Sequence, residues 1–301
     1  MNNKKAKYIA IPFVTIIIST LFIHTISKDK EISASENRTL AQKPNIEDVW
    51  KEGFTSKFES YFTDQFPFRE ELSELYSKAQ LMMGKNKIKS YYVLNNNWIM
   101  PTPIKELPDT HIKDTAKEIN ELSQVAIDSN KKVYYVSTPH KESMLTHLYP
   151  KYTNGLENAT NNKNKFKSYL DKNNIKFIDT GKDFLAKFNE KEREELYFKT
   201  DHHWNGIGAY EGVKSIIENM DEVENVSWNN YTKTIFDKGY FLGSYNMNLN
   251  KLVKEDEEIP YIHLKNKPNY EYFKYDGKKE IKVKEEDVIA TRRNEDEILY
   301  G

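Results

Sequence analysis

The sequence contains no cysteine in its 301 residues. This absence excludes disulfide bonds, thiolate metal ligands and a cysteine nucleophile together. A chain without thiols also suits an oxidising compartment outside the cytoplasm, because it offers no group for stray oxidation to cross-link.

An excess of charge of either sign is lacking too. The chain carries 45 Lys and Arg against 46 Asp and Glu, a formal net charge of −1. Proteins that bind nucleic acid carry a clear basic excess, so we expect no nucleic-acid partner. The one local skew, the acidic residues 255–258, is too short to be an acidic tail.

Glycine-rich phosphate loops are missing as well. Gly206 and Gly208 alone do not make a dinucleotide motif, and no Walker-type loop occurs. We therefore expect no cofactor. Aromatic residues, by contrast, are plentiful, with 20 Tyr and 15 Phe. They allow a packed core, and a tyrosine-rich surface also suits sugar binding.

One long apolar run stands at the N-terminus. Residues 8–27 carry no Lys, Arg, Asp or Glu and follow Lys4, Lys5 and Lys7. About 20 helical residues span the ~30 Å hydrocarbon core of a bilayer, and flanking basic residues favour the cytoplasmic side. We expect residues 1–27 to form a cytoplasmic stub and a membrane anchor. The alternative is a signal peptide cleaved near residues 33–35, which gives a secreted protein.

The rest of the chain predicts a connector at 28–54 and one domain at 55–301. Phe58, Phe62 and Phe66 recur at helical spacing before Pro67, so we expect two helices between 55 and 83, broken at the proline. Residues 91–100 predict a β-hairpin whose turn is formed by three asparagines.

Helix and strand patterns then alternate. Strands are expected at 132–136 and 175–178, and helices at 111–130, 164–173, 181–189 and 206–220. This order predicts an α/β fold, a three-layer sandwich with a mainly parallel sheet. The residues expected to face inward are Ile112, Ala116, Ile119, Leu122 and Ala126 in one helix, and Ala209, Val213, Ile216 and Ile217 in another.

Functional groups in such sheets gather beyond the carboxyl ends of the strands. We expect residues 137–138, residues 179–180 and the loop of Asp201 at that edge. Beyond residue 221 the pattern weakens, although residues 272–283 predict a second hairpin. No closing strand or helix is recognisable before Gly301, so we expect the C-terminal part of the domain to be incomplete.

The most informative motif is Asp201-His202-His203-Trp204. The spacing of two places the side chains of Asp201 and His203 on the same side of an extended loop. The carboxylate can then fix the tautomer of the imidazole and stabilise its protonated form, as in a Ser-His-Asp triad. His202 and Trp204 are supporting residues, and the glycines that follow predict a helix start.

A triad also needs a nucleophile. Ser244, in a Gly-Ser-Tyr turn, is our candidate, followed by Ser137 and Ser143. A zinc site built from Asp201, the two adjacent histidines and His140 is an alternative. However, neighbouring histidines usually point to opposite sides, so we predict no metal.

Several segments resemble one bacterial family. The run from Tyr197 through Asp201–Trp204 to Tyr210 resembles the DHHW family, which is related to the SGNH-hydrolase-like domain of alginate O-acetyltransferases. Residues 36–40, 58–69 and 241–245 resemble further elements of that family. The likeness covers about residues 36–245.

The resemblance implies an extracytoplasmic enzyme that acts on a cell-surface polysaccharide. Asp201 and His203 match the acid and base that serve the family's serine, but the Gly-Asp-Ser-like turn of that serine is missing after residue 204. We expect an O-acetyltransferase or acetylesterase of the cell envelope, whose nucleophile is Ser244 or lies beyond residue 301. The alternative is a non-catalytic polysaccharide-binding or scaffold protein. An integral-membrane O-acyltransferase is a further partner that the resemblance implies.

Overall fold

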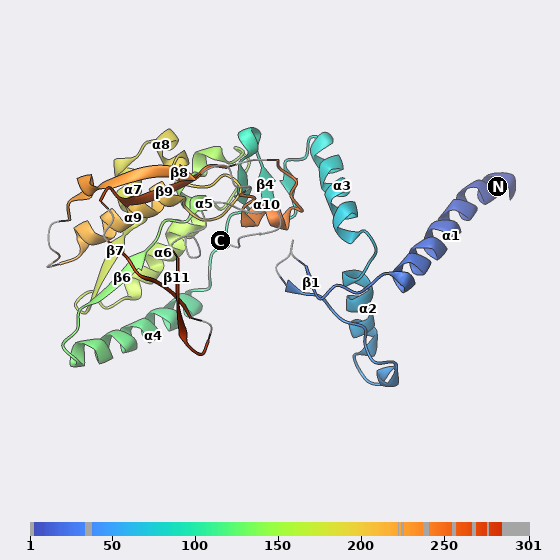
Figure 1. The fold of residues 1–301 in the computed structure, drawn as a ribbon, viewed down its shortest axis with the longest axis horizontal. Coiled ribbons are helices and arrows are strands. Elements are labelled where there is room, and N and C mark those ends of the chain that lie inside the picture. The colour runs from blue at the N-terminus through green and yellow to red at the C-terminus, as the bar shows by residue number, and fades with distance from the viewer. Residues whose placement is uncertain are drawn as a thin grey trace. The chain divides into compact units, whose positions relative to one another are not determined.

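A computed structural model describes residues 3–33, 38–221, 223, 226–236, 241–254, 257–266, 269–275 and 277–284 (Figure 1). Part of the predicted connector and the last 17 residues (285–301) lie outside them. The chain divides into two compact units, residues 1–85 with 247–252 and residues 86–246 with 253–301.

The first unit begins with a long apolar helix, α1 (Asn3–Ile26). Its stretch Lys7–Ile26 has 20 residues, a mean hydropathy of 2.2 and no buried part. It is thus long and apolar enough to cross a membrane, as the sequence predicts. A signal sequence has the same properties, so this helix fits either alternative.

Two further helices follow, α2 (Phe54–Asp64) and α3 (Arg69–Met82). The break at Pro67 is as predicted, and Phe68 takes a left-handed conformation there with φ of 56°. Between α1 and α2 lies a short antiparallel pair, β1 (Ile32–Ser33) and β2 (Arg38–Thr39).

Polar contacts hold this connector to the end of α2. The side chain of Gln65 accepts from Lys30 N at 2.9 Å and donates to the carbonyls of Lys30 and Ala41 at 2.9 and 3.0 Å. Arg38 donates to both oxygens of Asp64. That guanidinium holds the pKa of Asp64 at about 2, although burial acts in the opposite direction.

The second unit opens with a three-stranded antiparallel sheet, β3 (Lys87–Ile88), β4 (Tyr91–Val93) and β5 (Ile99–Pro101). The predicted hairpin is confirmed as β4–β5. Asn96 and Asn97 form its turn with φ of 58° and 64°, a conformation that asparagine tolerates better than most residues. Strand β3 was not predicted.

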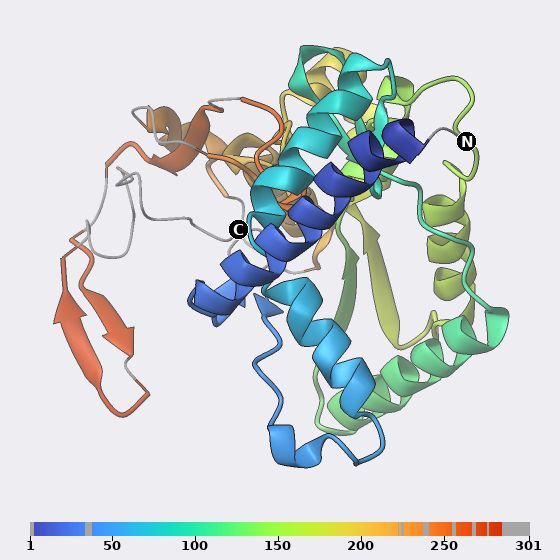
Figure 2. The same ribbon diagram turned by 90° about the vertical axis from the view of Figure 1, so that its right-hand side faces the viewer.

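The two predicted buried strands pair in parallel as β6 (Val133–Ser137) and β7 (Ile175–Asp179). Helices α4 (Asp109–Asp128) and α6 (Asn158–Tyr169) cover one face, where Tyr135 and Phe177 stack. The carboxyl ends meet, because Ser137 and Asp179 are partners in register. Figure 2 shows the two strands side by side.

The prediction of a mainly parallel sheet is wrong for the described residues. Only β6 and β7 pair in parallel there, and the other strand pairs are antiparallel. Strand β8 (Tyr231–Phe236) pairs with the distant β9 (Ile259–Leu264). The predicted second hairpin is confirmed as β10 (Tyr272–Tyr275) and β11 (Glu280–Val283).

The remaining elements are short, apart from α9 (Gly206–Asn219). Helix α7 (Thr180–Lys187) is separated from α8 (Glu190–Glu194) by Asn189, which forms a capping box with Glu192. The other short elements are α5 (Lys141–Met144), α10 (Ser244–Asn248) and the 3₁₀ turns Ile46–Asp48, Asn95–Asn97, Thr146–Leu148 and Trp228–Asn230.

Two expected helix faces need correction. Leu122 of α4 is 66% exposed and Val213 of α9 is 46% exposed. The buried residues of α9 are instead Gly208, Gly212 and Ser215. A Cβ atom on Gly208 would lie 2.3 Å from the carbonyl oxygen of Leu196, so the helix packs directly against backbone and large side chains do not fit.

We expect Gly208→Ala to destabilise the fold by about 1–3 kcal/mol, because the backbone of Leu196 would have to move. Helix propensity alone predicts that Gly208→Ala stabilises the fold by about 1 kcal/mol, because alanine favours a helix more than glycine does. Thermal unfolding of the full chain in detergent measures the change, with the exposed Val213→Ala as control. An unchanged or raised Tm for Gly208→Ala contradicts this packing.

Candidate active site

The acidic residue and the two histidines lie on the loop before α9. An antiparallel bridge between Tyr197 and Trp204 closes this loop. Asn205 then starts the helix, because its Oδ1 accepts from the N–H groups of Ile207 and Gly208 at 2.9 and 3.2 Å. The motif therefore stands at a helix N-terminus, as expected.

Asp201 is the buried centre of the site, with a side chain only 1% exposed. Its Oδ1 accepts from the backbone N–H of His203 at 2.9 Å, and its Oδ2 accepts from the backbone N–H of Ser244 at 2.6 Å. Burial acts to raise the pKa of this carboxyl, but these hydrogen bonds outweigh it and hold the pKa below its usual range. Asp201 is therefore a carboxylate at neutral pH.

His203 is oriented by this carboxylate. Its Nδ1 lies 2.7 Å from Asp201 Oδ1, while its side chain is 44% exposed. Among the described residues, nothing forms a hydrogen bond with its Nε2. A half-exposed imidazole that is held at Nδ1 by a carboxylate, and whose Nε2 has no hydrogen bond among the described residues, has the geometry of a general base.

His202 faces a different partner. Its Nδ1 lies 2.8 Å from Ser244 Oγ, and its ring centroid is 3.5 Å from that of His203. Burial lowers the pKa of His202, although the charge of Asp201 opposes this. The candidate serine is thus within the site, but its hydroxyl bonds to His202 and not to His203.

The other predicted residues have structural contacts. Ser143 Oγ donates to the carbonyl of His140 at 2.9 Å, and the carbonyl of Ser137 accepts from Thr180 at 2.7 Å. The indole of Trp204 packs beside Phe184, with ring centroids 6.3 Å apart, in the core below the loop.

Two charged residues beside the motif, Lys141 and Glu257, are not predictable from the sequence. Lys141 is completely buried, and its ammonium donates to the carbonyls of Ile99, Lys199 and Asp201 at 2.9, 2.7 and 3.0 Å. The carboxylate of Glu257 accepts from the backbone of Lys199 and from Thr200. No spacing pattern distinguishes either residue from the many solvated charges of this chain.

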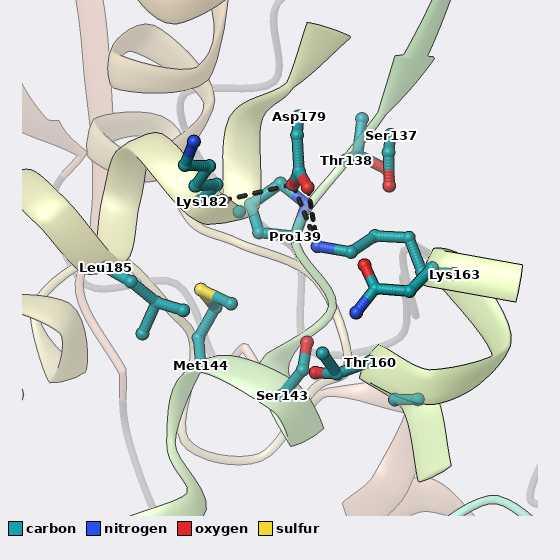
Figure 3. A pocket seen from close by; sticks show the side chains of 13 residues that line it. Ser137, Thr138, Pro139, Ser143, Met144, Thr160, Lys163, Asp179, Lys182 and Leu185 are labelled. Atoms are coloured by element: carbon teal, nitrogen blue, oxygen red, sulfur yellow. Dashed lines mark hydrogen bonds and ion pairs between the residues drawn. The ribbon is translucent and has the colours of Figure 1, made fainter. Parts of the chain in front are cut away.

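A cavity of about 240 Å³ opens at the carboxyl end of β6 and β7, where such a site is expected. Figure 3 shows Lys163 reaching across it to Asp179, with which it pairs at 2.8 Å. This pair neutralises both of its charges, and the rest of the lining offers hydroxyl groups, apolar carbons and the side chain of Lys182. The other residues that line it include Pro139, Ser143, Met144, Thr160 and Leu185.

Three of the four residues proposed as alternative zinc ligands lie close together in the structure. Asp201, His202 and His203 each offer a ligand atom, all within 4.8 Å of one another, whereas His140 is not part of this group. Both oxygens of Asp201 already accept hydrogen bonds from N–H groups. An ion would have to displace the contacts that hold His203, so the donor set fits a hydrogen-bonded acid–base pair better than zinc.

A family model described as "SGNH hydrolase-like domain, acetyltransferase AlgX" matches residues 96–259, more than half of the chain. The chain therefore belongs to this family, and the resemblance noted in the sequence is confirmed. The matched region contains the Asp201–Trp204 motif, Ser244, Lys141 and Glu257. No curated protein matches the chain.

Solved structures with a similar fold include PatB1 from Bacillus cereus, at 23% identity and a TM-score of 0.58, with 68% of this chain and 70% of that chain covered. A PatB1 structure with a sulfonyl adduct has 24% identity and a TM-score of 0.49, with 58% of this chain and 55% of that chain covered. A DHHW family protein from Eubacterium siraeum has 19% identity and a TM-score of 0.44, with 57% of this chain and 53% of that chain covered. The chain thus spans little more than half the length of the latter two structures, and the likeness at these identities concerns the fold.

We expect acid to weaken the fold through Asp201. Its pKa is lower in the folded protein than the unfolded value of about 3.9, so its contribution to stability is present above that value. The contribution is lost as the pH falls through the folded-state pKa. Chemical unfolding between pH 6 and pH 3 should show a shallower loss for Asp201→Asn than for the wild type. An equal loss of unfolding free energy with pH in both proteins would contradict a lowered pKa of Asp201. Asp114→Asn, at an exposed carboxylate of α4, serves as control.

Proposed function

We propose that this protein is an extracytoplasmic O-acetyltransferase or acetylesterase that acts on a polysaccharide of the cell envelope. Membership of the SGNH hydrolase-like acetyltransferase family supports the reaction class. The observation that carries the proposal is the 2.7 Å contact between Nδ1 of His203 and Asp201, which leaves Nε2 without a hydrogen bond among the described residues. This arrangement suits proton transfer in acyl transfer.

In the first half-reaction a serine Oγ attacks the acetyl carbonyl carbon, and its proton passes to Nε2 of His203. The same proton then goes to the departing alkoxide, which leaves as an alcohol and gives an acetyl-serine. In the second half-reaction His203 accepts the proton of a sugar hydroxyl or of water, whose oxygen attacks the carbonyl carbon of the acetyl-serine. The bond between the acetyl group and the serine oxygen then breaks, and the proton on His203 returns to that oxygen. Throughout, the carboxylate of Asp201 stabilises the imidazolium.

Ser244 remains our candidate nucleophile. Its backbone N–H already binds Asp201, and its hydroxyl lies beside the neutral His202. Attack assisted by His203 requires the Ser244 hydroxyl to exchange its His202 partner for His203, whose ring centroid lies 3.5 Å from that of His202. The non-catalytic alternative, a protein that binds or scaffolds polysaccharide, needs no such exchange.

The cavity beside Lys163 is our candidate place for a sugar ring, because hydroxyl groups and apolar carbons form much of its lining. The Asp201–Trp204 motif and Ser244 are not among the residues that line it. We further propose that an integral-membrane O-acyltransferase supplies the acetyl group, since polysaccharide outside the cytoplasm has no direct access to cytoplasmic acyl donors.

His203→Ala should reduce turnover of an acetyl ester such as p-nitrophenyl acetate by at least about 10³-fold, because the general base is lost. His147→Ala, a histidine paired with Glu194 outside the loop, is the control and should keep most activity. Full activity of His203→Ala contradicts the mechanism. Equal loss in Ser244→Ala supports Ser244 as nucleophile, whereas retained activity there removes it from the mechanism.

The absence of cysteine provides a clean test of location. We expect a cysteine introduced by Asp114→Cys, on the exposed side of α4, to react with a membrane-impermeant maleimide in intact cells or protoplasts. A cysteine from Asn3→Cys, before the apolar run, should react only after permeabilisation if the helix is an anchor. Labelling of the second cysteine alone in intact cells contradicts the proposed orientation.

A further inference from the structure

The backbone just before the motif is buried and cannot be solvated by water. Thr200 is 0% exposed and Asp201 is 1% exposed. Buried peptide groups need partners, and each one left without a hydrogen bond costs about 1–3 kcal/mol. Two of these groups have backbone partners, because the N–H of Ile99 donates to the carbonyl of Lys199 at 3.0 Å and the N–H of Asn246 donates to that of Thr200 at 3.2 Å. The N–H groups of Lys199 and Thr200 and the carbonyl of Asp201 bond to charged side chains instead.

Charged side chains provide these partners from two directions. The ammonium of Lys141 has three protons, and it donates them to three carbonyl oxygens, two of which belong to Lys199 and Asp201. A neutral amine has only two protons to donate, so the contacts require the charged form. Burial nevertheless lowers the pKa of Lys141, and the carboxylates of Glu257 and Asp201 act against that shift.

Glu257 contributes the opposite charge. Its carboxylate accepts from the backbone N–H groups of Lys199 and Thr200 and from the hydroxyl of Thr200. Burial raises the pKa of Glu257, whereas these hydrogen bonds and the nearby Lys141 lower it. One residue therefore binds the carbonyl groups of the segment, and the other binds its N–H groups.

A third contact fixes the same segment. Gly243 has φ of 53°, and a Cβ atom there would lie 2.3 Å from the carbonyl carbon of Thr200. Because of this close approach, the backbone N–H of Ser244 donates to the carboxylate of Asp201. The backbone N–H of Asn246 donates to the carbonyl of Thr200 at 3.2 Å. The carboxylate of Asp201 is thus placed by the backbone around it.

We propose that Lys141 and Glu257 form a charge clamp on the backbone of residues 199–201, which sets the position of Asp201 and thereby of His203. Neither residue touches His203, so they are positioning residues and not catalytic ones. Lys141 is completely buried and Glu257 is partly buried, so holding the loop with their charges costs desolvation free energy. The prediction about the loop stands by itself, and only its effect on turnover rests on the proposed function.

Amide hydrogen exchange tests the clamp without reference to activity. The reporters are the backbone N–H groups of His203 and Ser244, both of which donate to Asp201. In Lys141→Met and in Glu257→Gln we expect exchange at both amides to become about tenfold faster or more, because a hydrogen bond to a charged group is worth at least that factor. Lys163→Met is the matched control, since it removes a partly buried lysine from another pair.

Glu257→Gln keeps the shape of the side chain and one carbonyl acceptor, so it carries the test if Lys141→Met does not fold. Unchanged exchange at His203 and Ser244 in a folded Glu257→Gln or Lys141→Met protein overturns the clamp. Equal acceleration in Lys163→Met also overturns it, because the effect would then be general loosening.

If the wild type turns over an acetyl ester, kcat should fall in the clamp variants while KM changes little. A wild type without turnover refutes the proposed function and leaves the exchange result interpretable.

Discussion

The organisation of the candidate site depends on one physical constraint, the burial of the chain at Thr200 and Asp201. A loop that carries a general base is usually at the surface, where water satisfies its backbone. Here Thr200 and Asp201 are buried, and the carbonyl and N–H groups around them bind Lys141 and Glu257. As a result, the carboxylate of Asp201 is desolvated and held in place, whereas the imidazole of His203 beside it is half-exposed.

Small residues allow the neighbouring elements to approach this loop. Gly208 places α9 against the backbone of Leu196, and Gly243 places the start of α10 against Thr200. Both contacts are between backbones, so they leave little room for side chains to adjust. The loop is consequently held by close backbone contacts at Gly208 and Gly243 and by hydrogen bonds from charged side chains.

The sequence predicted those parts of the molecule whose information is local. The break at Pro67, the asparagine turn at 95–97 and the parallel pair β6–β7 follow from turn chemistry and short apolar runs. The Asp201–His203 contact follows from a spacing of two on a loop. Partners that are distant in sequence could not be predicted, as the pairing of β8 with β9 and the contacts of Glu257 illustrate.

The errors also have physical causes. Apolar residues such as Val213 were assigned to the buried side of α9, but close backbone packing gives that side to glycines. Lys141 resembles any surface lysine in a sequence that is 30% charged. Only the three carbonyl groups around its ammonium show why it is buried.

The most direct test of the account is the tautomer of His203, measured by ¹⁵N NMR of the imidazole in the full chain above the pH at which the ring loses its charge. The contact with Asp201 predicts a proton on Nδ1 and none on Nε2, the form that can act as a general base. Free histidine prefers the opposite tautomer. A proton on Nε2 and none on Nδ1 would contradict the proposed acid–base pair.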